Sequence, residues 1–240
     1  TPTLDVLRNG LKTSESNGPR SGTGQTSPTA GRGGAGGRGS PRAAGGPGRG
    51  SSGRPDPTKE LWSAVRDGKS PLFVNVDNAS AILHVMSATE KQEKLKLALV
   101  ASGPDVYLNL DNLEKDRFTL VLPPRIDLEP STRFRINVPA MLKEKGIQFV
   151  FSLSLGQSDF RAMQQNPLFA VAMLVRGGLD RQAALRALTL GPAELIGRES
   201  EIGSLEEGKS ANLVLFDGDP FAATSAIDQV FIQGKPINED

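Results

Sequence analysis

Few side chains in this sequence could do chemistry, and the first candidate is a carboxylate at the end of an apolar run. Residues 72–76 (Leu-Phe-Val-Asn-Val) predict a strand, and Asp77 follows directly. In an extended backbone Asp77 points to the same side as Asn75, two residues before it. The pair could form a site built on a single carboxylate, but a solvated or helix-capping acid is the simpler interpretation.

The sequence contains one histidine, His84, and no cysteine. The lack of cysteine excludes thiolate zinc sites, disulfides and cysteine nucleophiles, and it is compatible with either cytoplasm or periplasm. His84 falls inside an expected helix over residues 79–92, so we interpret it as a structural or surface residue rather than a ligand or base.

Residues Gly203–Ser210 (Gly-Ser-Leu-Glu-Glu-Gly-Lys-Ser) fit the pattern G-x-x-x-x-G-K-[ST] of phosphate-binding loops. Such a loop needs a buried strand before it and a helix after it. Here polar residues 198–201 precede it and the strand-like run Ala211–Phe216 follows. Glu206 and Glu207 would also place negative charge against the phosphates. We therefore interpret the match as a plain turn and expect no nucleotide site.

Two further groups of charged residues invite a functional interpretation. Asp217 and Asp219 look like a catalytic pair, but Asp-Gly-Asp-Pro is a turn sequence. Arg125 and Arg133, in a long crossover, could face a substrate. Solvated loop arginines are the commoner case, and we assign none of the four a catalytic role.

Strand and helix patterns alternate along most of the chain. Strands are expected at Leu72–Val76, Leu95–Ala101, Phe118–Leu122 and Ile147–Leu153. The helices expected after them are Ala79–Gln92, Val106–Lys115, Val138–Lys145 and Pro167–Gly177. This alternation predicts right-handed βαβ units and a parallel sheet. Two short helices should follow, the first capped by Asp180 and ending near Gly191, the second starting at Pro192 and ended by Gly197 in a left-handed conformation.

The first quarter of the chain has a different composition. Residues 1–56 are rich in Gly, Arg, Ser and Pro with few large apolar side chains, which predicts a disordered segment. Its Arg–Gly runs suggest RNA binding as an alternative function, but no aromatic residue is interleaved and a flexible linker is the simpler interpretation. The net charge of +1 does not favour nucleic acid. No apolar run is long enough to span a membrane, and no signal peptide heads the chain, so the compartment stays open.

The stretch from Thr189 to Pro220 carries a family resemblance. Thr189–Gly197 (Thr-Leu-Gly-Pro-Ala-Glu-Leu-Ile-Gly) and Ile202–Pro220 closely resemble the C-terminal end of metal-dependent amidohydrolases, in particular the imidazolonepropionase-like branch. Gly191 and Asn212 replace the usual Asn and Asp. The resemblance implies an α/β fold, namely the C-terminal half of a (β/α)8 TIM-type barrel followed by a short β-sandwich return segment.

The resemblance also implies the division of the chain. We expect a disordered segment at 1–56, a partial amidohydrolase-like barrel at 57–200 and a β-sandwich segment at 201–240. The first four strands of the family barrel, with their paired metal-binding histidines, have no counterpart here. A half barrel leaves open sheet edges, so a complementary N-terminal half or a homo-oligomer is the expected partner. The Gly-rich segment is then an insertion in a longer protein.

Catalytic positions in such barrels lie at the carboxyl ends of the strands. The resemblance places Asn75 at a histidine ligand of the metal, Ser102 near a second ligand, and Ser154 at the catalytic aspartate, with Asp77 as a substitute ligand. An amide is a weak zinc ligand, and a serine hydroxyl cannot replace a carboxylate as a base near neutral pH.

Three functions follow as hypotheses. The first is an amidohydrolase-like protein that is catalytically inactive, a pseudoenzyme that binds no metal, although zinc or another divalent metal serves the family. The second is an active hydrolase of non-peptide C–N bonds, completed by a missing N-terminal half. The third is RNA binding through the Arg/Gly-rich tail. The substrate is not specified by these residues.

Overall fold

The computed structural model describes residues 57–153 and 167–237. Three expectations lie outside these ranges: the disorder of residues 1–56, RNA binding by that segment, and the placement of Ser154.

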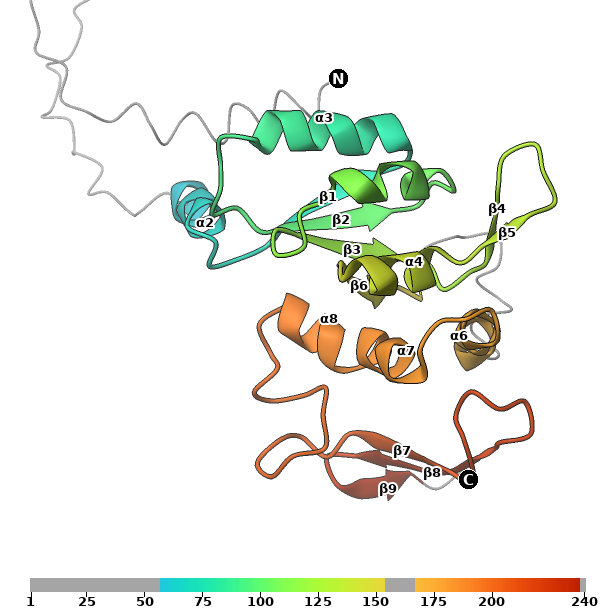
Figure 1. Cartoon of the computed structure of the whole chain (residues 1–240). Coiled ribbons are helices and arrows are strands. Elements are labelled where there is room, and N and C mark those ends of the chain that lie inside the picture. The colour runs from blue at the N-terminus through green and yellow to red at the C-terminus, as the bar shows by residue number, and fades with distance from the viewer. Residues whose placement is uncertain (1–56, 154–166, 238–240) are drawn as a thin grey trace, which may run out of the picture.

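A four-stranded parallel sheet forms the centre of the fold, with its strands in the order β1-β2-β3-β6 (Figure 1). The strands are β1 (Leu72–Val76), β2 (Leu97–Ala101), β3 (Phe118–Leu122) and β6 (Gln148–Phe151). Every neighbouring pair is parallel, which confirms the prediction made from the alternation of strand and helix patterns.

One face of this sheet is buried beneath the helices that follow the strands. These helices are α3 (Ala79–Thr89), the 3-10 helix η1 (Val106–Asn112) and α4 (Val138–Lys145). Leu99 and Leu120 point into this layer and are fully buried against Ile82 of α3 and Leu142 of α4. Burial of these aliphatic side chains supplies the main stabilisation of the fold.

The opposite face of the sheet is open at β1 and buried in its middle. Phe73 in β1 is 51% exposed and Asn75 is also exposed, whereas their neighbours Val74 and Val76 are buried. Ala98, Val121 and Val150, one from each of β2, β3 and β6, are buried on this face, and Leu195 of the segment that follows is packed against them. The alternation of exposed and buried residues along β1 thus marks the covered face, and what we call the open face is exposed at this strand.

Four more helices surround this core. They are α2 (Pro57–Arg66), α6 (Pro167–Arg176), α7 (Arg181–Leu188) and α8 (Leu190–Leu195). Asp180 caps α7 by accepting a hydrogen bond from the Ala183 N–H (2.8 Å), as predicted. Gly197 follows α8 with a φ of 70°, also as predicted, although α8 begins at Leu190 rather than Pro192. In residues 57–153 and 167–237, no helix has the length and apolar character needed to cross a membrane.

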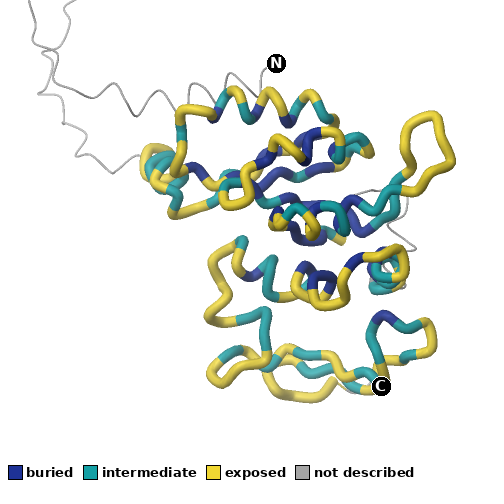
Figure 2. Tube along the Cα trace, viewed as in Figure 1, coloured by how far each residue is buried: buried dark blue, intermediate teal, exposed yellow. Residues whose placement is uncertain are grey.

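A hairpin and a second sheet complete the described structure. The hairpin, β4 (Asp127–Leu128) with β5 (Arg135–Ile136), interrupts the crossover between β3 and α4. The second sheet is a three-stranded antiparallel sheet made of β7 (Leu213–Phe216), β8 (Ile227–Ile232) and β9 (Lys235–Ile237). Figure 2 shows that this sheet contains no buried residue, in contrast to the parallel sheet.

Several expected boundaries differ from the structure. The helix expected to reach Gln92 ends at Thr89, whose carbonyl oxygen accepts a hydrogen bond from Arg117. The helix expected over 106–115 is a 3-10 helix that stops at Asn112. The second and fourth strands are shorter than expected at 97–101 and 148–151.

Candidate functional site

The carboxyl end of β1 presents an amide and a carboxylate. Asn75 lies on the open face of the sheet, paired in register with Val100 of β2. Asp77 follows the strand, is exposed, and accepts a hydrogen bond from the Asn78 side chain (2.8 Å). The helix cap is Asn78 rather than Asp77, because Asn78 Oδ1 accepts from the Ala81 N–H (2.8 Å). Asp77 is therefore held beside the start of α3 by its neighbour.

The end of β2 lies against the end of β1 through the backbone. Ser102 is exposed, and its N–H donates to the Val76 carbonyl oxygen (3.1 Å). A Cβ added at Gly103 would lie 2.1 Å from the Asp77 carbonyl oxygen, which is closer than any side chain tolerates. Gly103 is thus required by this close approach, and no ligand-bearing side chain fits at that position without a backbone shift.

The end of β3 carries an ion pair that joins two strand ends. Arg125 Nε donates to Asp127 Oδ1 (2.7 Å), and Arg125 Nη2 donates to the Ser102 carbonyl oxygen (2.9 Å). Burial raises the pKa of the Asp127 carboxyl above its ordinary value, while Arg125 acts in the opposite direction. Arg125 is therefore a structural link between β2 and the hairpin, rather than the solvated loop residue that we expected. The Arg-Ile-Asp spacing was the sequence signal for this pair.

Asp105 and Asn109 were not singled out in the sequence, yet they fix the start of α3. Asp105 Oδ2 accepts from the Ala79 N–H (3.1 Å), and Asn109 Nδ2 donates to the Ala79 carbonyl oxygen (2.5 Å). Among the described residues, the other carboxylate oxygen of Asp105 is buried without a hydrogen-bond partner. Both residues position the backbone just after Asp77.

The remaining sequence candidates lie away from these strand ends or serve as turns. His84 is exposed on α3. In the segment Gly203–Ser210, Lys209 pairs with Glu206 (3.3 Å) and donates to the Ser204 hydroxyl (2.5 Å). Strand β7 follows this segment, whereas a phosphate loop is followed by a helix.

The Asp-Gly-Asp-Pro segment has the turn structure that its sequence suggests. Asp217 Oδ1 accepts from the Ala226 N–H (2.8 Å), and Asp219 Oδ1 accepts from the Phe221 N–H (3.1 Å). Asp219 also pairs with Arg181 of α7. The pKa of Asp219 lies below its ordinary value, first because of the Phe221 N–H and then because of Arg181. Both carboxylates therefore accept hydrogen bonds from backbone N–H groups of the loop that follows β7.

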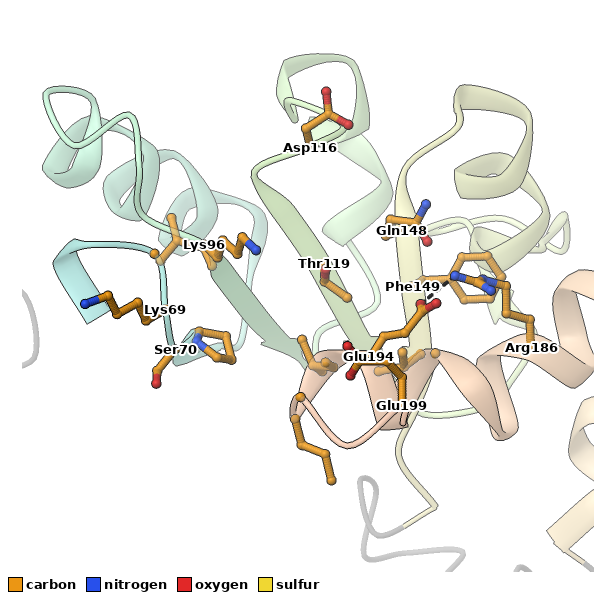
Figure 3. Close-up of a pocket in the computed structure, with 18 residues that line it drawn as sticks. Lys69, Ser70, Lys96, Asp116, Thr119, Gln148, Phe149, Arg186, Glu194 and Glu199 are labelled. Atoms are coloured by element: carbon orange, nitrogen blue, oxygen red, sulfur yellow. Dashed lines mark hydrogen bonds and ion pairs between the residues drawn. The ribbon is translucent and has the colours of Figure 1, made fainter. Parts of the chain in front are cut away.

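A cavity of about 520 Å³ lies at the opposite, amino-terminal end of the strands (Figure 3). Thr119 and Gln148, at the starts of β3 and β6, line one side of it. Arg186 and Glu194, which form an ion pair (2.5 Å), line the other. This cavity does not coincide with Asn75, Asp77 or Ser102.

The profile of the amidohydrolase family matches residues 78–237, two thirds of the sequence. The chain belongs to the amidohydrolase family. The curated relatives agree with the imidazolonepropionase-like resemblance. An imidazolonepropionase from Treponema denticola is 41% identical over 61 residues, which cover 23% of this chain and 15% of the relative. An imidazolonepropionase from Syntrophobacter fumaroxidans is 38% identical over 78 residues, covering 30% of this chain and 18% of the relative.

Solved amidohydrolase structures show the same fold over part of their length. An amidohydrolase from Thermotoga maritima superimposes with a TM-score of 0.61 at 23% identity, covering 78% of this chain and 48% of that protein. A zinc-bound adenosine deaminase from Xanthomonas campestris gives a TM-score of 0.51 at 18% identity, with coverages of 75% and 48%. This chain therefore spans about half of these amidohydrolase structures and less than a fifth of the curated relatives.

Amidohydrolases commonly depend on a metal, so we asked whether the strand ends of this member fit one. Zinc prefers imidazole, thiolate and carboxylate ligands, and a structural or catalytic site needs at least three protein ligands. In residues 57–153 and 167–237, no three His, Asp or Glu side chains are grouped so as to hold an ion. Asn75, Ser102 and Asp77 offer one amide, one hydroxyl and one carboxylate. These residues do not fit the zinc site of the family.

Proposed function

We propose that this chain forms the last four βα units of an amidohydrolase (β/α)8 barrel at residues 57–200 and a β-sandwich segment at 201–240. We further propose that it is a pseudoenzyme unit, retained for structure, assembly or binding. The parallel order β1-β2-β3-β6 and the covered outer face support the barrel assignment. In this arrangement the open face of the sheet is the interior of the barrel, and a complementary N-terminal half is its partner.

The observation that carries the proposal is the chemistry of the strand ends. Catalysis of C–N hydrolysis in this family needs a metal-bound water and a carboxylate that takes its proton. Asn75 stands at the expected histidine position and Ser102 near a second ligand. Gly103 leaves no room for a side chain beside Asp77. Ser154, at the position of the catalytic aspartate by sequence, has no group able to serve as base near neutral pH.

One observation favours a second candidate function, an active hydrolase completed by the missing half. Asp77 is exposed at the end of β1, so its carboxylate is accessible to a metal held mainly by residues of another segment. The named relatives make imidazolonepropionate the first substrate to test. In this alternative, no other residue has been identified that replaces the metal ligand expected at position 75 or the catalytic base expected at position 154.

The deciding experiment measures the metal content of the purified, dialysed chain by elemental mass spectrometry, with circular dichroism on the same sample. We expect a folded chain with no stoichiometric metal and no hydrolysis of imidazolonepropionate. Near-stoichiometric zinc on the folded chain would overturn the proposal and point to Asp77. If zinc does appear, an Asp77→Asn variant that loses it, beside an Asp116→Asn control that keeps it, would identify the ligand.

A further inference from the structure

The loop between β7 and β8 begins with an aspartate that is directly followed by a glycine. In an Asp-Gly pair the glycine nitrogen can attack the carboxyl carbon of the aspartate side chain, and glycine hinders this approach least because it has no side chain. The sequence contains two such pairs, Asp67-Gly68 and Asp217-Gly218. Both aspartates are exposed, so the surroundings of each glycine decide which pair reacts.

The pair Asp67-Gly68 is locked in the turn that follows α2. The Gly68 N–H donates to the Val65 carbonyl oxygen (3.1 Å). Gly68 has a φ of 71°, and a Cβ added there would lie 2.4 Å from the Lys94 carbonyl oxygen, so its backbone packs directly against another segment. The Gly68 nitrogen therefore reaches the Asp67 carboxyl only after this turn has opened.

The pair Asp217-Gly218 is held by fewer contacts. Within the part of the chain that the structure describes, the Gly218 N–H has no hydrogen-bond partner. The φ of Gly218 is outside the left-handed region, and the atom nearest to an added Cβ is Ser225 Oγ (2.8 Å), which belongs to a side chain rather than to the backbone. The Asp217 carboxyl accepts from the Ala226 N–H in an exposed hydrogen bond, with which water competes. The Gly218 nitrogen is thus available to this carboxyl without the opening of a packed turn.

We propose that Asp217 is a site of spontaneous isomerisation to isoaspartate. In the first step the Gly218 nitrogen forms a bond to Asp217 Cγ, and the carboxyl hydroxyl leaves as water with the proton of the Gly218 N–H, which closes a succinimide ring. In the second step water adds to the main-chain carbonyl carbon of Asp217, and the bond from this carbon to the Gly218 nitrogen breaks. The main chain then runs through Cγ, and no group is oxidised or reduced. Asp219 does not react in this way, because the Pro220 nitrogen carries no proton.

The product changes the loop that attaches the second sheet. Isomerisation adds one carbon to the main chain just after β7, and it turns the Asp217 side-chain carboxyl, which accepts from the Ala226 N–H, into a main-chain amide. The same loop holds Phe221 in the main hydrophobic core and pairs Asp219 with Arg181. The reaction therefore acts on the contacts that join this sheet to the rest of the chain. The inference does not depend on the proposed lack of catalysis.

The first test compares the two Asp-Gly pairs within one sample of the full chain. The chain is kept for several weeks at neutral pH and physiological temperature and is then digested after its lysines. Asp67 and Asp217 fall in separate peptides, residues 60–69 and 210–235. Isoaspartate in each peptide is measured by mass spectrometric fragmentation and by enzymatic methylation of its carboxylate.

We expect about tenfold or more isoaspartate at Asp217 than at Asp67, because opening the turn around Gly68 adds to the barrier. In concentrated urea the two positions should react at similar rates, since the fold no longer distinguishes them. The Asn-Gly pairs at residues 9–10 and 17–18 form the same ring with loss of ammonia, and they serve in urea as positive controls for detection.

The second test changes the attacking residue. Gly218→Ala should slow the reaction at Asp217 by about tenfold, because the methyl group hinders the approach of the nitrogen. Thr224→Ala is the matched control, since Thr224 is an exposed residue of the same loop that takes no part in the reaction. Circular dichroism shows whether both variants keep the fold.

Three outcomes would overturn the proposal. The first is a folded chain in which Asp67 isomerises as fast as Asp217. The second is a chain whose Asp217 isomerises in urea but not in the folded state, which would show that the hydrogen bond from Ala226 protects the carboxyl. The third is a folded Gly218→Ala variant that isomerises as fast as wild type.

Discussion

At the scale of single residues, Gly103 has the most restricted position at the candidate site. A Cβ there would lie 2.1 Å from the Asp77 carbonyl oxygen, and the nearest obstacle is backbone rather than a flexible side chain. The φ of Gly103 is not in the left-handed region, so its backbone conformation does not require glycine. A side chain is excluded here because another segment of the chain lies too close. Gly103 therefore sets how closely the ends of β1 and β2 meet.

Substitution of Gly103 by alanine should destabilise the chain by about 1–3 kcal/mol, because the new methyl group forces a backbone shift. Urea unfolding followed by circular dichroism measures this change. Ser102→Ala is the matched control, since Ser102 is exposed and only its backbone groups form the hydrogen bonds described above. Equal stability of both variants would show that the strand ends are more widely separated in solution.

Restoring two family residues should not restore chemistry. The double variant Asn75→His, Ser154→Asp is expected to bind no stoichiometric zinc and to leave imidazolonepropionate unchanged, because the remaining ligands are not supplied at these strand ends. Elemental analysis and a substrate assay measure both. The same variant with His84→Ala separates zinc bound at the surface of α3 from zinc at the strand ends. Hydrolysis by the double variant would mean that the rest of the site is intact.

At the scale of elements, the hairpin β4–β5 is attached to the sheet through a partly buried acid. Burial raises the pKa of Asp127 above 3.8, so the folded chain holds this proton more readily than the unfolded chain. The resulting contribution to stability is complete below pH 3.8. It is lost as the pH rises through the folded pKa.

An Asp127→Asn variant removes this loss, since asparagine does not titrate. The unfolding free energy of wild type, relative to that of Asp127→Asn, should therefore fall as the pH rises from 3.5 towards 7. Thermal unfolding at several pH values measures it. In a chain that keeps Asp127, Arg125→Gln should enlarge this fall in unfolding free energy. Arg125 lowers the pKa of Asp127, so its removal raises that pKa further. A pH-independent difference between wild type and Asp127→Asn would contradict this assignment.

The local sequence pattern was sufficient to predict both ends of some helices and strands, but not of others. The strands at 72–76 and 118–122 and the helix at 138–145 agree with the prediction at both ends. Their limits follow from apolar runs, an Asn cap and Gly146, all visible in the sequence. At the early end of α3, the Thr89 carbonyl oxygen accepts a hydrogen bond from Arg117, 28 positions away, and no local pattern could have predicted this contact.

The candidate site was predictable only in part. The helix pattern predicted His84 to be a structural or surface residue, and it is exposed on α3. The link from Arg125 to the Ser102 carbonyl and the close approach at Gly103 arise between segments that are distant in sequence. Such contacts depend on tertiary packing, which a single sequence does not reveal.

At the scale of the whole molecule, the two faces of the parallel sheet should respond differently to truncation. Phe73→Ala on the open face should cost less than about 1 kcal/mol, close to a surface substitution. Leu99→Ala on the covered face should cost about 2–5 kcal/mol. Urea unfolding of both variants compares them directly. Similar costs would mean that the open face is covered in solution.

The second sheet is joined to the rest of the molecule by more than the linker that follows α8. Phe221, in the loop between β7 and β8, is buried as part of the main hydrophobic core, and Asp219 beside it pairs with Arg181 of α7. A protease that cuts after exposed Arg198 would therefore nick the chain without releasing the C-terminal piece. The fragment would leave only when Phe221 is withdrawn, so its dissociation would report the opening of the core rather than the breakage of the linker.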